Sequence, residues 1–215
     1  KITARTAAIA GFSIFGTDHT FLLDDKMKLQ INKLITFLKK YKNEKIFIFG
    51  FTFVVWKFFI QSLISQKIRF NKIDGTLIHG GGWKKLIEQS VNNNEFKSKV
   101  SNILGINKVV NYYGMVEQTG SIFMECEKGY LHSSVFSDVI MRRPDFSISD
   151  IQEEGLVQLV SLLPSSYPGH SLLSEDVGRI VGEDNCECGR LGKYFEIQGR
   201  VAEAEIRGCS DTYNG

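Results

Sequence analysis

The first half of the chain alternates between apolar runs with helical spacing and apolar runs typical of strands. From Asp24 to Lys40 the apolar residues recur mostly at helical intervals and lysines fill the other face, which predicts an amphipathic helix. Short apolar runs at Lys45–Phe49, Thr76–His79 and Val109–Tyr112 are typical of buried strands. Strands that alternate with helices favour a largely parallel sheet with helices on its faces.

Two more helices are expected between these strands, over Phe53–Ser65 and Trp83–Val91. The first lies in the apolar stretch Ile46–Ile64, whose length approaches that of a membrane span. Because Lys57 stands in its middle, a strand, a turn and a buried helix explain the stretch better than a membrane segment. Asn92–Asn94 is interpreted as a polar loop.

After residue 120 the apolar runs become shorter and turn residues separate them. Four strands are expected in this region, at Tyr130–Ile140, Gly155–Leu163, Gly178–Val181 and Tyr194–Gly199. This pattern predicts an antiparallel β subdomain appended to the α/β part. We therefore expect an α/β part over residues 1–120, a β subdomain over 121–200 and a C-terminal segment over 201–215.

Length, charge and cysteine content narrow the class of protein. With 215 residues, 43% of them hydrophobic, the chain can bury a large core. Its formal net charge of +2 gives no sign of a surface dedicated to nucleic acid or to an anionic membrane. The four cysteines are too few for a disulfide scaffold and no signal peptide opens the chain, so a cytoplasmic location is expected. The chain lacks an initiator Met, and we expect a fragment or a missing N-terminal portion.

Three glycines mark a candidate ligand-binding turn. Gly80, Gly81 and Gly82 follow the strand expected at Thr76–His79, at the edge where open parallel sheets bind ligands. The alternative is a flexible turn. No Gly-Lys-Ser/Thr sequence follows, so the run is not a phosphate-binding P-loop.

A second run and a distant aspartate add the chemistry of a nucleotide site. Tyr113 offers a flat face for adenine, Gly114 permits a turn, and Glu117 can hold a Mg²⁺ that bridges phosphates. Asp176, expected just before a strand, can accept both ribose hydroxyls. The alternatives are a core tyrosine beside a surface glutamate, and an aspartate in a β-turn. Together the runs indicate an enzyme that activates a carboxylic acid with ATP.

The cysteines divide into a candidate metal site and one separate thiol. Cys126, His132, Cys186 and Cys188 would supply three thiolates and an imidazole, which suits a closed, structural Zn²⁺ site. The alternative is four unrelated residues, two of them buried thiols. Cys209 has no partner at metal spacing, and the Arg-Gly pair before it favours a mobile, reactive thiolate, with an incidental thiol as the alternative.

In their order and spacing these runs resemble the adenylate-forming (ANL) superfamily, and within it the LuxE-type acyl-protein synthetases, which are relatives of phenylacetate–CoA ligases. The resemblance covers roughly residues 45–213. Its motifs are a glycine loop, a YGxTE motif in which Val116 replaces Thr, a LuxE-type signature, a CxCGR turn and a hinge segment. They correspond to His79–Lys84, Tyr113–Glu117, Leu163–Gly178, Cys186–Arg190 and Gly199–Asp211.

The resemblance implies the large-domain portion of an adenylate-forming enzyme and a two-step reaction. A fatty acid carboxylate attacks the α-phosphate of ATP, giving an acyl-adenylate and pyrophosphate, and a thiol then displaces AMP. In LuxE-type enzymes this thiol is a cysteine near the C-terminus, to which Cys209 corresponds. A partner reductase then reduces the thioester, in luminous bacteria to a fatty aldehyde.

The resemblance also implies a role for each candidate residue. Tyr113 would stack on adenine and Glu117 would bind Mg²⁺. Asp176 would hold the ribose, and Arg200 would lie at the hinge near the phosphate. The glycines would border the adenine and the acyl group, namely Gly80, Gly81 and Gly82.

The sequence departs from the superfamily pattern at three points. The hydroxyl-rich phosphate loop is absent, Ala202 replaces an acidic hinge residue, and the lid domain with its catalytic lysine is missing, as in LuxE-type chains. Two other interpretations therefore stay open. One is an acyl- or aryl-CoA ligase relative with CoA as acceptor, and the other is a degenerate domain that acts as a zinc-stabilised scaffold.

Overall fold

The computed structural model describes residues 4–83, 90–118 and 120–201. Its contacts divide the chain into two units, one that runs to Val110 and one that starts at Asn111. Each unit is described by itself. The division into three segments expected from the sequence stays a prediction.

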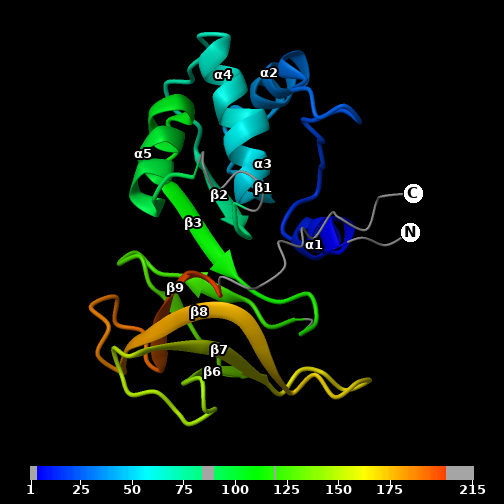
Figure 1. Cartoon of the computed structure of the whole chain (residues 1–215). Coiled ribbons are helices and arrows are strands. Elements are labelled where there is room, and N and C mark those ends of the chain that lie inside the picture. Colours follow the sequence, from blue (N-terminus) through cyan, green and yellow to red (C-terminus); the bar gives the residue numbers. More distant parts are fainter. Residues whose placement is uncertain (1–3, 84–89, 119, 202–215) are drawn as a thin grey trace. The chain divides into compact units, whose positions relative to one another are not determined.

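The first unit combines helices with a pair of parallel strands (Figure 1). β1 and β2 pair in parallel, with Ile46 opposite Gly75 and Phe51 opposite Gly80. The strand β3 begins in this unit and ends in the second. The elements are α1 Ala4–Ser13, α2 Ile31–Lys40, β1 Ile46–Phe51, α3 Thr52–Val54, the π-helical segment η1 Val55–Ile60, α4 Gln61–Ser65, β2 Gly75–Gly80, α5 Asn93–Leu104 and β3 Lys108–Tyr113.

Helices cover both faces of β1 because its side chains alternate. Phe47 and Phe49 lie against Phe12 of α1, with ring centroids 6.2 and 4.2 Å away. Ile46 and Ile48 point to the other face, into a core built by the continuous helical run α3–η1–α4 and by α5. The expected arrangement of parallel strands with flanking helices is thus confirmed for this unit.

The three helices expected in this unit have different outcomes. The Phe53–Ser65 helix is confirmed, and Lys57 lies exposed on it. The Asp24–Lys40 helix begins only at Ile31, because the Asp24 carboxylate accepts the backbone N–H groups of Lys26 and Lys28 and so holds a turn. Most of the expected Trp83–Val91 helix lies outside the described residues.

The interpretation of Asn92–Asn94 as a loop is wrong. The helix α5 starts at Asn93, and the Asn92 side chain accepts the Glu95 backbone N–H at 2.9 Å as its N-cap. Gly105 ends the helix in the left-handed conformation, with φ +65°.

The second unit is an antiparallel sheet, as the turn-rich sequence predicted. Its strands lie in the order β3-β4-β5-β9-β8-β7-β6, and every pairing described from β3 onward is antiparallel. Phe123, Phe195 and Leu159 are fully buried at the centre of its core. The strands are β4 Phe123–Glu125, β5 Leu131–His132, β6 Ser137–Arg142, β7 Glu154–Ser161, β8 Ser171–Glu183 and β9 Lys193–Arg200.

Two strand predictions in this unit are corrected. The run Tyr130–Ile140 is two strands, because residues 133–136 form a turn between β5 and β6. The strand expected at Gly178–Val181 is the long, curved β8, which spans 13 residues (Figure 1). Asp176 therefore lies inside a strand, opposite Arg200 of β9, and neither before a strand nor in a β-turn.

Among the described helices, none combines the length and the apolar character needed to cross a membrane. The fold is a mixed α/β fold, with parallel pairing in its first unit and an antiparallel sheet in its second.

Candidate functional site

Three residues predicted to bind nucleotide lie together in the second unit. The Tyr113 hydroxyl donates to Asp176 Oδ2 at 2.6 Å. Arg200 Nε lies 3.3 Å from Asp176 Oδ1. Tyr113 ends β3, whereas Asp176 and Arg200 are opposed on β8 and β9, so antiparallel pairing brings together residues that are far apart in the sequence.

The Asp176 carboxylate keeps acceptor capacity for a ligand. An ionised carboxylate offers about four lone-pair sites, and Tyr113 and Arg200 occupy two of them. The Asp176 side chain is 21% exposed, so its remaining sites are accessible. Two further acceptor sites are what a pair of ribose hydroxyls would need.

Tyr113 is held as a neutral hydrogen-bond donor. Burial, reinforced by the adjacent negative charge of Asp176, raises the pKa of Tyr113 far above its ordinary value. Its ring lies with its centroid 6.3 Å from that of Phe195, in an edge-on arrangement that fixes the ring plane. Tyr113 thus orients Asp176 at any physiological pH.

Arg200 contacts two neighbouring carboxylates. Besides Asp176, its Nη2 lies 2.9 Å from Glu175 Oε2, and the Glu175 side chain is 58% exposed. Ser174 holds β8 in place next to Asp176, since its hydroxyl donates to the Val157 carbonyl of β7 and accepts the Asp176 backbone N–H. Ser174 is a positioning residue that sequence reasoning missed.

The turn after Tyr113 presents Glu117 to solvent. The Gln118 N–H donates to the Met115 carbonyl at 3.1 Å, and Glu117 is exposed on this turn. A Cβ on Gly114 would lie 2.9 Å from the Ser121 carbonyl oxygen, so this position needs glycine. An exposed carboxylate on a tight turn is free to reach a metal ion that is bound by phosphates.

Gln118 is the second residue that sequence reasoning missed. It is fully buried, and its amide donates to the Leu159 and Gly169 carbonyls at 3.2 and 2.9 Å. It therefore ties the turn that carries Glu117 to β7 and to the loop before β8. Its place at the end of the Tyr113 motif was the only sequence signal.

The glycine run lies at the carboxyl end of β2 in the first unit. Gly80 ends the strand and Gly81 has φ +78°, a conformation that favours glycine. His79 just before it is 2% exposed, and its Nδ1 lies 3.0 Å from Thr52 Oγ1. Burial lowers the pKa of His79 to about 3, so its imidazole is neutral.

The four candidate metal ligands converge in the second unit. The ligand atoms of Cys126, His132, Cys186 and Cys188 all lie within 4.8 Å of one another. We call this group the Cys/His cluster. Burial, with the Arg190 guanidinium nearby, lowers the pKa of His132, which keeps the ring in the neutral form that binds metals.

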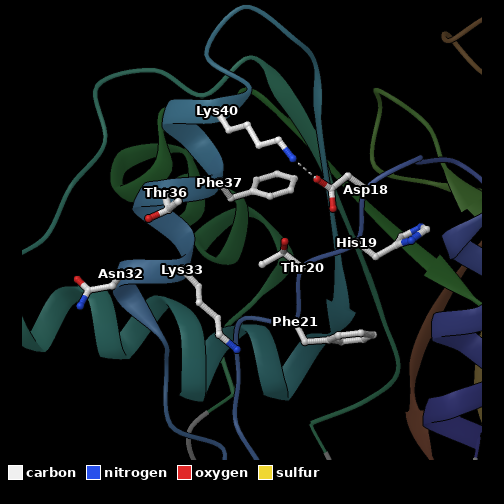
Figure 2. Close-up of a pocket in the computed structure, with 9 residues that line it drawn as sticks. All are labelled: Asp18, His19, Thr20, Phe21, Asn32, Lys33, Thr36, Phe37 and Lys40. Carbon is white, nitrogen blue, oxygen red and sulfur yellow. Dashed lines mark hydrogen bonds and ion pairs between the residues drawn. The ribbon is translucent and has the colours of Figure 1, made fainter.

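An open pocket in the first unit involves none of these candidates (Figure 2). Hydrogen bonds from Tyr41 and Lys40 lower the pKa of Asp18 at its rim. The Lys40–Asp18 pair spans 2.9 Å between exposed side chains, so it adds little stability. The lining residues are Asp18, His19, Thr20, Phe21, Asn32, Lys33, Thr36, Phe37 and Lys40.

The predicted nucleophile Cys209 lies outside the described residues, as does Ala202. Their roles stay predictions.

The family described as "Acyl-protein synthetase, LuxE" matches residues 1–215. No curated protein matches the chain significantly.

Solved structures of similar fold are adenylate-forming ligases. One is an open conformation of 2-hydroxyisobutyryl-CoA ligase in complex with 2-HIB-AMP and CoA (TM-score 0.61, 18% identity, 80% of this chain and 36% of that chain). Another is O-succinylbenzoate coenzyme A synthetase from Bacillus subtilis with ATP and magnesium ion (TM-score 0.52, 13% identity, 84% and 36%). A third is ATP-bound MatB from Rhodopseudomonas palustris (TM-score 0.50, 14% identity, 77% and 33%). At these identities the likeness concerns the fold, and the chain spans about a third of each structure's length.

Proposed function

Because this chain belongs to the LuxE acyl-protein synthetase family, we propose that it is part of an AMP-forming acid–thiol ligase. The enzyme activates a carboxylic acid, a long-chain fatty acid in the simplest case, as its acyl-adenylate. It then transfers the acyl group to the thiol of Cys209. A partner reductase consumes the resulting thioester.

The grouping of Tyr113, Asp176 and Arg200 is the observation that carries this proposal. The three offer an aromatic face, a carboxylate with open acceptor sites and a cation, which are the groups that an adenosine phosphate needs. Asp176 accepts the ribose hydroxyls while Tyr113 holds its carboxylate in place. Arg200, already between Glu175 and Asp176, can turn toward the α-phosphate.

The first half-reaction joins the acid to AMP. A carboxylate oxygen of the acid bonds to the α-phosphorus of ATP, and the bond from that phosphorus to the pyrophosphate oxygen breaks. Arg200 stabilises the negative charge that gathers on the phosphoryl oxygens. A Mg²⁺ held through Glu117 would neutralise the phosphates when bound. Gly80 to Gly82 carry no side chains, so a ligand could approach their backbone closely.

The second half-reaction moves the acyl group to sulfur. The thiolate of Cys209 attacks the acyl carbon, and the bond to the AMP oxygen breaks, so AMP leaves with the electron pair. A reducing cytoplasm suits a thiol with this role. A structural Zn²⁺ at the Cys/His cluster joins ATP and Mg²⁺ in the proposed cofactor set and takes no part in either step.

A second acceptor is CoA, because one similar structure contains 2-HIB-AMP together with CoA. In that case the enzyme is an acyl- or aryl-CoA ligase and Cys209 is incidental. Both acceptors share the first half-reaction.

The test is intact-mass spectrometry on the native protein that contains this chain. Incubated with ATP, Mg²⁺ and a long-chain fatty acid, it should gain one acyl group that hydroxylamine removes. The adduct should map to Cys209 and disappear in Cys209→Ser.

The other outcomes contradict this assignment. AMP released without an adduct, and only when CoA is present, would make the protein a CoA ligase. Neither AMP nor adduct with fatty and aromatic acids would favour the non-enzymatic scaffold.

A further inference from the structure

The Cys/His cluster joins two turns of the same construction. The turn after β4 reads Cys126-Glu-Lys-Gly129, and the turn between β8 and β9 reads Cys186-Glu-Cys-Gly189. In each, the glycine N–H donates to the carbonyl of the first cysteine, at 3.0 and 2.9 Å. Both glycines have positive φ, +88° and +81°, which lets the chain fold back within four residues. His132 follows the first turn, on β5.

The spacing of the ligand atoms fits a tetrahedral zinc ion. Bonds of about 2.3 Å to sulfur and about 2.0 Å to nitrogen, at tetrahedral angles, separate two sulfurs by about 3.8 Å and a sulfur from a nitrogen by about 3.5 Å. Here Cys126 Sγ and Cys186 Sγ are 4.0 Å apart, and Cys188 Sγ and His132 Nε2 are 3.5 Å apart. A disulfide would need sulfurs about 2.05 Å apart, so the two thiols are not bonded to each other.

Backbone N–H groups point at the sulfurs in the manner expected of thiolates. The Lys128 N–H donates to Cys126 Sγ at 3.4 Å, and the Arg190 N–H donates to Cys188 Sγ at 3.5 Å. In both cases the donor lies two residues after the cysteine. Such bonds hold each sulfur in place and favour its negative form.

The charged residues of the two turns pair across the cluster. Lys128 of the first turn lies 2.7 Å from Glu187 of the second, and Arg190 of the second lies 3.5 Å from Glu127 of the first. These side chains are well exposed, so the pairs add little stability by themselves.

The local apolar core around the two turns is small. The buried residues here are Cys126, Cys186 and Tyr194, with few partly buried neighbours around them. His132 packs its ring against Tyr194, with centroids 5.6 Å apart and planes 18° apart, which sets the direction of Nε2. A metal ion would add cohesion to this small core, beyond the β5–β9 pairing that already joins the two hairpins.

We propose that the Cys/His cluster is a closed structural zinc site that clamps the β8–β9 hairpin to the β4–β5 hairpin. Soft thiolates select zinc over magnesium or calcium, and four protein ligands leave no open position for catalysis. The clamp acts at one end of the hairpin whose other end carries Asp176 and Arg200. The end of β8 at Glu183 lies seven positions after Asp176, about 23 Å along an extended chain, so the metal site is distinct from the nucleotide site.

The first test measures the metal content of the native protein, purified without added metal, by inductively coupled plasma mass spectrometry. We expect one zinc per chain. Cys126→Ser and Cys188→Ser should each lose it, whereas Cys209→Ser and the exposed-histidine control His170→Gln should keep it. Zinc retained in full by both cluster variants, or no zinc in the wild type, would overturn the proposal.

A rescue variant separates loss of a ligand from loss of folding. His132→Cys completes a four-thiolate site and should retain zinc, whereas His132→Ala should lose it. On the wild type, replacement by Co²⁺ should give the thiolate-to-metal absorption of a tetrahedral site. Removal of the metal should increase hydrogen exchange at the β8 and β9 amides. Octahedral cobalt spectra, or unchanged exchange in the metal-free protein, would contradict the clamp. None of these readouts depends on ATP or on the acid, so their failure is distinct from a failure of the proposed activity.

Discussion

At the scale of single residues, the neighbouring carboxylates of Asp176 and Glu175 have different roles. Asp176 contacts both Tyr113 and Arg200, whereas Glu175 pairs with Arg200 from an exposed position. We expect Asp176→Ala to weaken ATP binding by roughly tenfold or more. A hydrogen bond to a charged group contributes more than about 1.4 kcal/mol, which is the free energy that corresponds to a tenfold change in affinity. Glu175→Gln, the matched control, should change it by less than about threefold.

Isothermal titration of the native protein with ATP and Mg²⁺ measures both effects. Equal losses in the two variants would mean that Asp176 has no special role at the nucleotide.

His79 gives a prediction about pH. Its pKa is about 3 when folded, because burial disfavours the charged form, and near 6.5 when unfolded. A group whose pKa is lower in the folded state contributes its full stability at a pH above its unfolded pKa. This stability is lost as the pH falls toward its folded pKa. Between pH 7 and pH 5 the free energy of unfolding should therefore fall by about 2 kcal/mol through His79 alone.

Urea unfolding followed by tryptophan fluorescence measures this term, since Trp56 and Trp83, the chain's two tryptophans, both lie in the first unit with His79. His79→Gln should reduce the pH dependence, whereas His170→Gln should leave it unchanged. An identical dependence in wild type and His79→Gln would refute the assignment.

At the scale of elements, the hairpin that carries Asp176 and Arg200 depends on a glycine. A Cβ on Gly178 would lie 2.4 Å from the Glu196 carbonyl oxygen and 3.2 Å from Val157, next to a break in the β8–β9 register. Gly178→Ala should destabilise the protein by about 1–3 kcal/mol, as overpacking does. Gly199→Ala, on the partner strand with nothing within 4 Å of its Cβ, should cost about 0.5 kcal/mol or less.

Thermal unfolding followed by circular dichroism compares the two glycine variants. A smaller loss for Gly178→Ala than for Gly199→Ala would show that the close approach of β8 and β9 is not as described.

Element boundaries were less readable from the sequence than element types. Periodicity identified β1, β2 and the helix after β1. It extended α2 back to Asp24, however, where a side-chain hydrogen bond holds a turn instead. It missed α5, although Asn92 with Glu95 three residues later is a capping pattern. It also shortened β8, because Ser174, which is buried, and Asp176, which belongs to the candidate site, interrupt the apolar pattern that marks a strand.

At the scale of the molecule, each unit has its own buried core. The change from helical periods to short, turn-bounded runs near residue 120 predicted this change of architecture. Local patterns, in contrast, contain no information on which distant residues meet in space, such as Tyr113 and Asp176, which are 63 positions apart. Only their chemistry and the family resemblance suggested that they belong to one site. The Cys/His cluster was predictable in part, since thiolates and an imidazole are ligands that suit zinc. Only the fold, however, brings Cys126 close to Cys186.

The reverse of the first half-reaction tests the central claim most directly. The native protein is incubated with ATP, Mg²⁺, labelled pyrophosphate and a carboxylic acid, and label is measured in ATP. We predict exchange that requires the acid. It should persist in Cys209→Ser, because the thiol acts only in the second step. In Asp176→Ala the exchange rate should fall at least tenfold, which corresponds to roughly 1.4 kcal/mol of transition-state stabilisation. Absence of exchange with both fatty and aromatic acids, or exchange that does not need an acid, would contradict acid activation by this chain.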